Sequence, residues 1–299
     1  MKSYFDNGLR FSKLSSQNLP KISTEGIEPL AEESIPRENL FKKLLLNLMP
    51  ILFILTGWEI VAQLTIHIKE VPFPTPIFTC QRLIELMTGK LFLQHTLYGH
   101  LIASLLRWGT GFILGTISGI ILSTFISRSL LWQRIMMPLI YILQLIPGLA
   151  WIPIAILLFG IGEASTIFMI FVIALVPVII NMVAGIRNVE EMYVKAAQMM
   201  GANSRTIFFQ ILLPGSLPHL LSGLRVAVAS SWRVVIAAEM VVGTGSGLGY
   251  SIIQARWNLD YASAFVCIIT ICIVGLIIEK VFFERIERYT IQRWGLVSS

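Results

Sequence analysis

The sequence predicts an all-α, polytopic membrane protein with about six transmembrane helices. Of its 299 residues, 55% are hydrophobic and only 13% are charged, whereas soluble domains carry about 25% charged residues. The mean hydropathy of +0.76 is too high for a chain that buries its apolar side chains in one water-soluble core. A lipid bilayer must therefore solvate much of the surface of this chain.

Six apolar runs are long enough to cross the ~30 Å hydrocarbon layer as helices of about 20 residues. The third run contains Pro147 and Pro153, so we expect this helix to be kinked or partly unwound. A glycine-rich turn at 159–163 separates it from the fourth run. The predicted spans are 44–66, 99–126, 133–158, 164–186, 219–243 and 262–283.

The positions of Lys and Arg predict the orientation of these spans. With the N-terminus inside, sixteen of these residues lie in cytoplasmic segments and four outside, or nine against four without the long N-terminal tail. Cytoplasmic loops carry the excess of positive charge, so both termini are predicted to be cytoplasmic. The net charge of +6 is explained in the same way. We therefore expect contact with membrane lipid and not with nucleic acid.

The chain divides into four predicted segments. A polar N-terminal tail precedes the first transmembrane helix and its outer connection, a core with the other five spans follows, and a short tail ends the chain. Within the outer connections, residues 83–91 favour a short interfacial helix, and the glycines of 243–249 favour a flexible turn, because no Gly-Lys-Ser/Thr follows them as in a phosphate loop. The segments are 1–43, 44–98, 99–283 with a cytoplasmic loop at 187–218, and 284–299.

The cytoplasmic loop 187–218 predicts two short helices joined at Gly201. Glycine adopts the left-handed conformation that ends a helix, and Asn203 or Ser204 can cap the second helix through its side-chain oxygen. We expect Pro214 to prevent that helix from continuing beyond the next turn. Periodicity alone leaves two hypotheses open, namely docking into a groove on another protein or lying on the lipid headgroups.

The spacing of residues within this loop resembles the cytoplasmic coupling signature of bacterial ABC-importer permeases. This resemblance implies a MetI-like permease core and a helix inserted into the cleft of a separate ATP-binding cassette subunit. One position departs from the signature, because the glutamate that usually opens it is replaced by Lys195. The matching residues are Ala196, Ala197, Gly201, Ile211, Leu213 and Pro214.

A narrower resemblance links the chain to the nitrate, sulfonate, taurine and bicarbonate class of these permeases, which implies a small anion as the transported solute. Residues 247–250, followed by Ala255 and Arg256, are more similar to aliphatic sulfonate and taurine permeases than to nitrate permeases. The segments that carry the resemblance are 147–153, 159–163, 232–239, 284–288 and 293–294.

The same resemblance implies the partners. The chain has no Gly-x-x-x-x-Gly-Lys-Ser/Thr motif, so we expect no enzymatic activity and no cofactor of its own, and ATP bound by the partner subunit. The resemblance also implies a second permease chain, which forms a homodimer with the first. A periplasmic or lipid-anchored solute-binding protein is expected to dock on the outer connections 67–98 and 244–261. The alternative hypothesis is an ion-coupled secondary transporter or channel; no catalytic motif indicates a membrane enzyme.

Ionisable residues inside apolar spans are costly and often functional. We expect the side chain of Arg225 to extend to the lipid headgroups, and Arg107 could do the same. Glu239 is expected to pair with a hydroxyl or backbone group near the outer end of the fifth span. Arg233 is the first candidate for contact with an anionic solute, on a different face of the helix from Glu239. The candidate pathway residues are Arg233, Glu239 and Trp151.

Small residues mark the expected helix contacts, because they let helices approach closely in lipid. These small residues could serve packing within one chain, a dimer interface or the lining of a pathway. For the dimer interface and the pathway, the fifth span is the better candidate. The residues are Gly111, Gly115 and Gly119 in the second span, and Gly223, Ala227, Ser230, Ser231, Ala237 and Ala238 in the fifth. Three cysteines, Cys80, Cys267 and Cys272, show no metal or redox spacing.

Overall fold

The computed structural model describes the backbone of residues 40–70 and 72–290, and the side chains of 48–70 and 72–280. Most of the two predicted tails, including the similarity at 284–288 and 293–294, lies outside the described side chains. The chain divides after Thr56 into two units. Of the first unit, residues 40–56 are described, and they are helical. The second unit, from Gly57 onward, contains the other helices and the last part of the helix at 40–69.

Five helices of the described chain are long and apolar enough to cross a membrane, and a sixth span exists if one bent pair is counted as one crossing. The all-α fold with about six transmembrane helices is thereby confirmed. Helix ends differ from the predicted ones by a few residues at most positions, as expected for boundaries set by caps. The five helices are α1 (Leu40–Lys69), α3 (Leu97–Ser127), α6 (Glu163–Arg187), α10 (Leu217–Val242) and α12 (Tyr261–Thr290).

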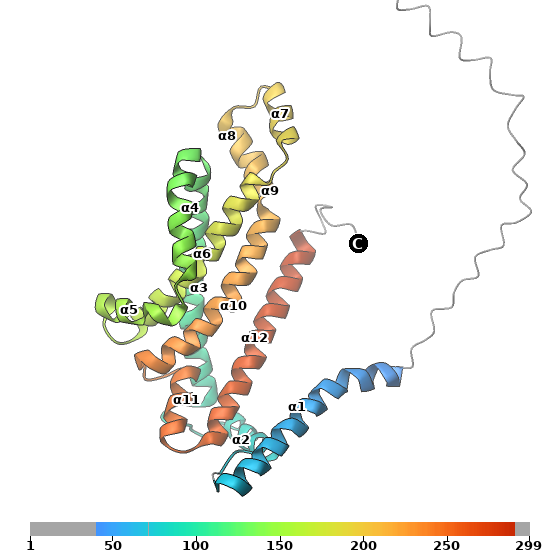
Figure 1. The fold of residues 1–299 in the computed structure, drawn as a ribbon, viewed down its shortest axis with the longest axis vertical. Coiled ribbons are helices and arrows are strands. Elements are labelled where there is room, and N and C mark those ends of the chain that lie inside the picture. Colours follow the sequence, from blue (N-terminus) through green and yellow to red (C-terminus); the bar gives the residue numbers. More distant parts are fainter. Residues whose placement is uncertain (1–39, 71, 291–299) are drawn as a thin grey trace, which may run out of the picture. The chain divides into compact units, whose positions relative to one another are not determined.

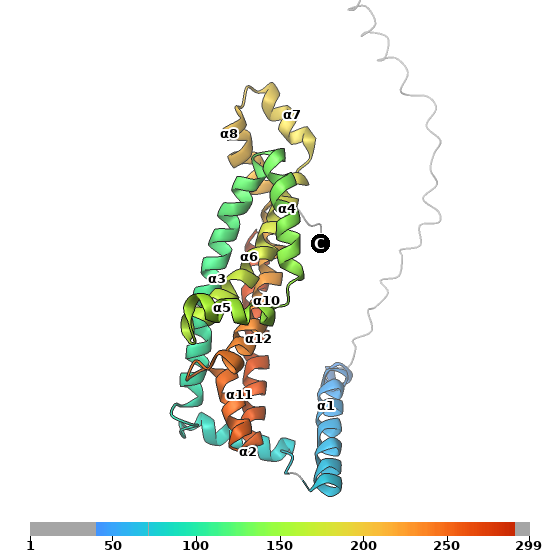
Figure 2. The same cartoon turned by 60° about the vertical axis from the view of Figure 1, so that its left-hand side comes forward.

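The predicted third span is broken rather than merely kinked. Helix α4 (Leu130–Leu145) ends before Pro147, and a 3-10 turn, η1 (Gly148–Trp151), leads into α5 (Ile152–Phe159). The two halves differ in direction by 103°, and α5 turns aside part-way along the bundle (Figures 1 and 2). Ile146 is extended, with φ −75° and ψ 118°, because a residue that precedes proline is pushed out of the helical region. The expectation that this span is kinked or partly unwound is therefore confirmed, and the bend is larger than that of a simple kink.

Helix α6 is the centre of the unit and the most buried of the spans. It packs against α3 on one side and α10 on the other. The glycine stripe of α3 makes the first contact: a Cβ at Gly115 would lie 2.7 Å from the carbonyl oxygen of Phe171, and one at Gly111 2.7 Å from Ile170. The stripe of the second span therefore serves packing within one chain.

Enlarging this stripe should disrupt the fold. We expect Gly115→Leu to lower the thermal unfolding temperature of the detergent-purified protein sharply, because α6 presents backbone at the contact and overpacking costs about 1–3 kcal/mol or more. Gly109→Leu is the matched control, since Gly109 lies on the same helix with nothing within 4 Å of a built Cβ. Equal unfolding temperatures for the two variants would contradict the assigned contact.

The small residues of α10 fall into two groups. Ala227, Ser231 and Ala238 are buried, and a Cβ at Gly223 would lie 2.8 Å from Asn181 of α6, so these residues serve internal packing. Ser230 is only partly buried, and its hydroxyl donates to the Val226 carbonyl of its own helix.

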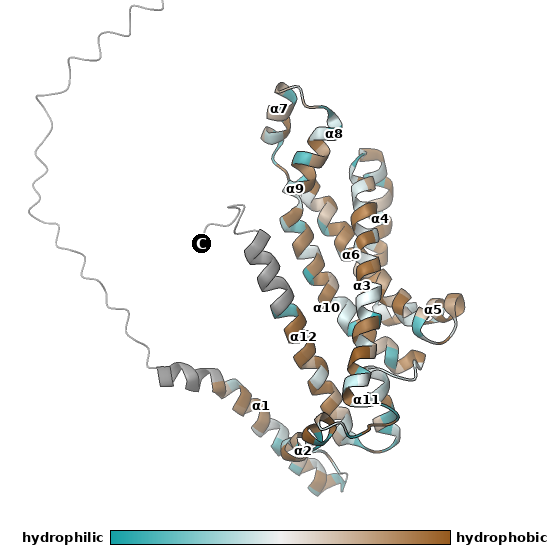
Figure 3. Cartoon of the chain, turned by 180° about the vertical axis from the view of Figure 1, so that it is seen from behind, coloured by the Kyte–Doolittle hydropathy of each residue, from teal (hydrophilic) through white to brown (hydrophobic). Residues whose placement is uncertain are grey.

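Opposite ends of the bundle carry different short helices. Helices α7 (Glu191–Met199) and α8 (Ser204–Ile207) lie at one end, while α2 (Pro76–Met87) and α11 (Leu248–Trp257) lie at the other (Figures 1 and 2). Apolar residues cover the long helices between them, and hydrophilic residues are frequent on α7 and α8 (Figure 3). The structure therefore separates the loop 187–218 from the two connections that the sequence places outside.

The first outer connection contains the expected short helix, which begins earlier than predicted. Thr75 caps α2 by accepting a hydrogen bond from the Phe78 amide. Arg82 joins α2 to the start of α12 through Asp260, at 3.0 Å, and through the Ser263 hydroxyl. At the exposed end of α2, the hydrogen bond from Lys90, reinforced by Arg82, lowers the pKa of the Glu85 carboxyl.

Candidate functional site

The inside loop forms the helical hairpin that the sequence predicts. Gly201 has φ +82°, and two hydrogen bonds close the end of α7: the Gly201 amide donates to the Gln198 carbonyl and the Ala202 amide to the Ala197 carbonyl, both at 3.0 Å. This is the Schellman pattern, in which a left-handed residue satisfies the last carbonyls of a helix. Asn203 then caps α8 by accepting from the Thr206 amide at 2.8 Å. The two helices are thus held by their capping residues.

The helical run of the second arm stops at Gly215, within one turn of Pro214, as expected. After α8 the chain continues through a π-helical turn, η2 (Phe208–Leu212), and a short helix, α9 (Leu213–Gly215), directly before α10. Pro214 lies in the first turn of α9, where no intrahelical N–H is needed. A single π turn commonly absorbs such a disturbance of the hydrogen-bond register. The second arm of the hairpin is therefore nearly continuous with the fifth span.

Helix α7 presents an apolar face at the end of the bundle. Met199 and Met200 are 83% and 81% exposed, and Met192 and Tyr193 are more than half exposed. Methionine is flexible and polarisable, which suits it to protein-binding surfaces. Lys195 forms an exposed ion pair with Glu191 of the same helix, at 3.2 Å. The replacement of the signature glutamate therefore leaves the helix intact.

The hairpin is anchored to the end of α3 through Arg128, whose importance the sequence analysis missed. The Arg128 guanidinium lies 5.6 Å from the ring centroids of both Phe208 and Phe209, an arrangement that favours cation–π attraction. On the other arm, Ala197 is buried, with 3% of its surface exposed. The hairpin is thus packed against the end of α3.

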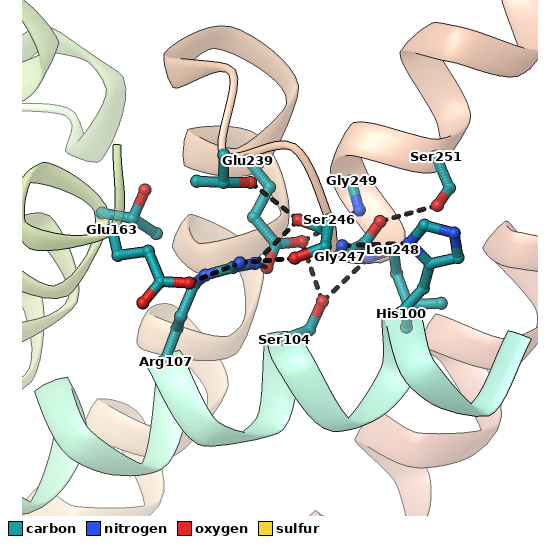
Figure 4. A network of polar contacts seen from close by, with 12 residues as sticks. His100, Ser104, Arg107, Glu163, Glu239, Ser246, Gly247, Leu248, Gly249 and Ser251 are labelled. Atoms are coloured by element: carbon teal, nitrogen blue, oxygen red, sulfur yellow. Dashed lines mark hydrogen bonds and ion pairs between the residues drawn. The ribbon is translucent and has the colours of Figure 1, made fainter. Parts of the chain in front are cut away.

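At the opposite end of the bundle, Arg107 of α3 lies at the centre of a buried polar network (Figure 4). Its guanidinium contacts Glu239 of α10 at 2.8 Å and Glu163, the first residue of α6, at 2.9 Å. It also donates to the backbone carbonyl and the hydroxyl of Ser246, both at 2.8 Å. Arg107 is 3% exposed, so it does not extend to the headgroups.

Glu239 is fully buried, and both of its carboxylate oxygens are engaged. One accepts from Arg107, and the other accepts from the Ser104 hydroxyl at 2.8 Å and from the Gly249 amide at 3.0 Å. The expected contacts with a hydroxyl and a backbone group are therefore present. The partner that the sequence analysis missed is Arg107. Two opposite charges within apolar spans were the available signal, because charges in the membrane pair with one another.

His100 extends the network toward the outer end of α3. Its Nδ1 atom accepts a hydrogen bond from the Gly247 amide at 3.2 Å, and its Nε2 atom lies 3.1 Å from the Phe92 carbonyl oxygen. Because an amide only donates and a carbonyl only accepts, the imidazole carries its proton on Nε2. The neutral ring thus ties the loop before α11 to the connection before α3.

The glycine-rich segment 243–249 forms a loop that leads into the first turn of α11, and its last two glycines lie in close contact with α10. A Cβ at Gly247 would meet the Glu239 carboxylate, and one at Gly249 would meet the carbonyl oxygen of Ile236. Gly247 also has φ +116°, a conformation that favours glycine. These glycines let the backbone approach Glu239. The network therefore joins α3, α6, α10 and α11 at the outer end of the bundle.

The structure places the candidate pathway residues in three different environments. Glu239 belongs to the network, whereas Arg233 is exposed on another face of α10, as the helix geometry predicts. Trp151 lies in η1 against Phe168, and its Nε1 is buried with no hydrogen-bond partner among the described residues. Arg225 lines a hollow between α10 and α12 together with Arg233.

These features can be compared with known proteins. Residues 111–290 match the family described as binding-protein-dependent transport system inner membrane component. This chain belongs to that family. The permease is 31% identical over 245 residues to a probable ABC transporter permease protein of Brucella melitensis, a match that covers 82% of this chain and 96% of the relative.

Two further relatives carry named solutes. The taurine transport system permease protein TauC of Escherichia coli is 30% identical, with 80% of this chain and 86% of TauC covered. The bicarbonate transport system permease protein CmpB of Synechococcus elongatus is 30% identical, with 83% and 90% covered. A solved chain of the inward-facing MetNI methionine ABC transporter has a TM-score of 0.50 and 20% identity, covering 70% of this chain and 98% of that chain. This likeness confirms the MetI-like fold.

Family membership confirms that the chain is a multi-pass component of the inner membrane and a permease subunit rather than an enzyme. ATP hydrolysis belongs to a partner subunit, and a solute-binding protein works with transport systems of this kind. The alternative of an ion-coupled secondary transporter finds no support in these relatives.

Proposed function

We propose that two copies of this permease form the pathway of an ATP-driven importer for a small anion, with taurine or another sulfonate ahead of nitrate and bicarbonate. The α7–α8 hairpin carries this proposal: its capped helices present an exposed methionine face at the end of the bundle. Such a face suits insertion into the cleft of an ATP-binding cassette subunit. The direct continuation of the hairpin into α10 would pass the movement of that subunit to the fifth span.

The proposed solute rests on sequence similarity. Relatives that share about a third of their residues with this chain include taurine, nitrate and bicarbonate permeases. The order of preference follows from residues 247–250 and the pair Ala255 and Arg256, which resemble sulfonate and taurine permeases. The proposed orientation, with both termini in the cytoplasm, follows from the distribution of Lys and Arg, and it places the solute-binding protein over α2 and α11.

Reconstitution tests the proposal. The permease is co-expressed with the ATP-binding subunit and the solute-binding protein encoded beside it, and uptake of taurine, nitrate and bicarbonate is measured in proteoliposomes. We expect the ATP-binding subunit to co-purify, and taurine uptake to require ATP and to stop with a non-hydrolysable analogue. Uptake driven by an imposed ion gradient in the absence of ATP would contradict the ATP-driven mechanism. Uptake of nitrate or bicarbonate but not taurine would contradict only the solute preference.

A further inference from the structure

Arg233 differs from the other deeply placed arginine in having no carboxylate partner. Its Nε atom donates to the Ala229 carbonyl of its own helix at 3.1 Å. No ion pair or further hydrogen bond of its guanidinium exists among the described residues. Arg107, by contrast, is paired with two carboxylates. An unpaired cation within a membrane span is costly and marks a solute or ion pathway more often than a structural site.

The depth of Arg233 excludes an easy escape to the headgroups. It lies sixteen residues after Leu217 and nine residues before Val242, which correspond to ~24 Å and ~14 Å along the helix axis at 1.5 Å per residue. Its side chain is exposed all the same. The guanidinium therefore faces a space within the depth of the membrane.

That space is a hollow of about 340 Å³ beside α10, large enough for a small solute. The break between α4 and η1 forms one wall: Gly148 approaches so closely that a Cβ there would lie 2.5 Å from Val234. Besides Arg233, the polar side chains that line the hollow are those of Gln144 and Ser230, and none of the lining residues is acidic.

The hollow offers N–H donors without a partner among the described residues, and no carboxylate lines it. The exposed Gln144 amide has no hydrogen-bond partner among the described residues, whereas the Ser230 hydroxyl donates to Val226 of its own helix at 2.7 Å. On the other side of α10, Arg233 borders a second hollow, of about 530 Å³, but that one contains Glu279. Charge complementarity therefore favours an anion in the hollow beside Gln144.

We propose that Arg233 and Gln144 form an oxyanion-binding site in the transport pathway, at the break between α4 and η1. The guanidinium fork matches the paired oxygens of a sulfonate, nitrate or bicarbonate group, and the Gln144 amide supplies a further donor. The site deepens the proposed function, on which its role in transport rests. The broken helix opens the wall of the hollow part-way through the membrane, where transporters often place solute sites.

The test uses Ser230→Cys as a reporter in the full permease assembled with its ATP-binding subunit in membrane vesicles, after replacement of Cys80, Cys267 and Cys272. We measure its reaction rates with an anionic reagent, 2-sulfonatoethyl methanethiosulfonate, and with neutral methyl methanethiosulfonate. We expect Arg233→Gln to lower the ratio of anionic to neutral rates on the order of tenfold, and Arg233→Lys to restore most of it because it keeps the charge.

Two controls separate a local effect from a general one. Arg256→Gln removes the same charge from α11, where Arg256 lies against the ring of Trp257, and should leave the ratio unchanged. A reporter at Thr88→Cys, exposed after α2, should not respond to Arg233→Gln. The proposed site would be wrong if the ratio of anionic to neutral reaction rates at position 230 did not depend on Arg233. It would also be wrong if neither reagent reached the reporter cysteine, with or without ATP. Neither readout requires a known solute, so failure here is distinct from failure of the proposed function.

Discussion

Replacing Gly201 with valine is expected to abolish ATP-driven uptake while leaving membrane insertion intact. Gly201 has φ +82°, and a β-branched residue in this left-handed conformation costs about 1–3 kcal/mol. The α7–α8 hairpin is small and exposed, so this strain would be relieved by opening the end of α7 rather than by unfolding the bundle. The exposed methionines would then no longer be presented in one orientation. Uptake and co-purification of the ATP-binding subunit are the two measurements.

Gly89→Val provides the matched control for this variant. Gly89 follows the cap of α2 with φ +90°, and a Cβ at either glycine has nothing within 4 Å. The two substitutions therefore impose similar backbone strain at opposite ends of the bundle. We expect Gly89→Val to keep the bound ATP-binding subunit. If Gly201→Val transported normally, or if both variants lost the subunit equally, the coupling role of the hairpin would be wrong.

Removing Arg107 is expected to destabilise the permease more than any surface substitution. In Arg107→Met the Glu239 carboxylate stays fully buried without its cation, and breaking a buried ion pair in this way costs about 3–5 kcal/mol. The thermal unfolding temperature of the detergent-purified protein should fall on the order of 10 °C. Lys90→Met is the control, because the exposed pair of Lys90 with Glu85 contributes at most about 1 kcal/mol.

A double variant distinguishes the pair from the separate contributions of its members. In a Glu239→Gln background the carboxylate charge is absent, so Arg107→Met should lower the unfolding temperature by less than it does in the unmodified protein. Glu163 is 67% exposed at its side chain and can remain hydrated in either background. Additive effects of the two substitutions would show that Arg107 and Glu239 do not stabilise the fold as a pair.

The elements predicted well from the sequence depend on local physics. Span lengths follow from the thickness of the bilayer, and the hairpin follows from Gly201 and Asn203, whose capping roles require only neighbouring residues. The break of the third span was likewise signalled by Pro147. The angle of this break was not signalled, because a proline disfavours helical backbone in the residue before it but does not set the direction in which the chain resumes.

The elements predicted poorly depend on contacts between distant segments. Arg107 and Glu239 are separated by 132 residues, so the sequence shows two opposite charges within apolar spans but does not identify them as partners of each other. The glycines at 247 and 249 suggested a flexible turn, and their close approach to Glu239 and Ile236 exists only after the helices have packed. The π turn that precedes Pro214 is likewise not visible from composition.

The sequence by itself determined that the chain is a membrane protein, where its helical segments lie, and that the α7–α8 hairpin turns at Gly201. These features depend on solvation by lipid and on helix capping, which act over one or two turns of chain. Only the tertiary structure decided which charges are neutralised and which stay available. It pairs Arg107 with two carboxylates and leaves Arg233 facing a hollow without one. The physical reason is that, at these depths in the membrane, the fate of a charge depends on the side chains that folding brings next to it.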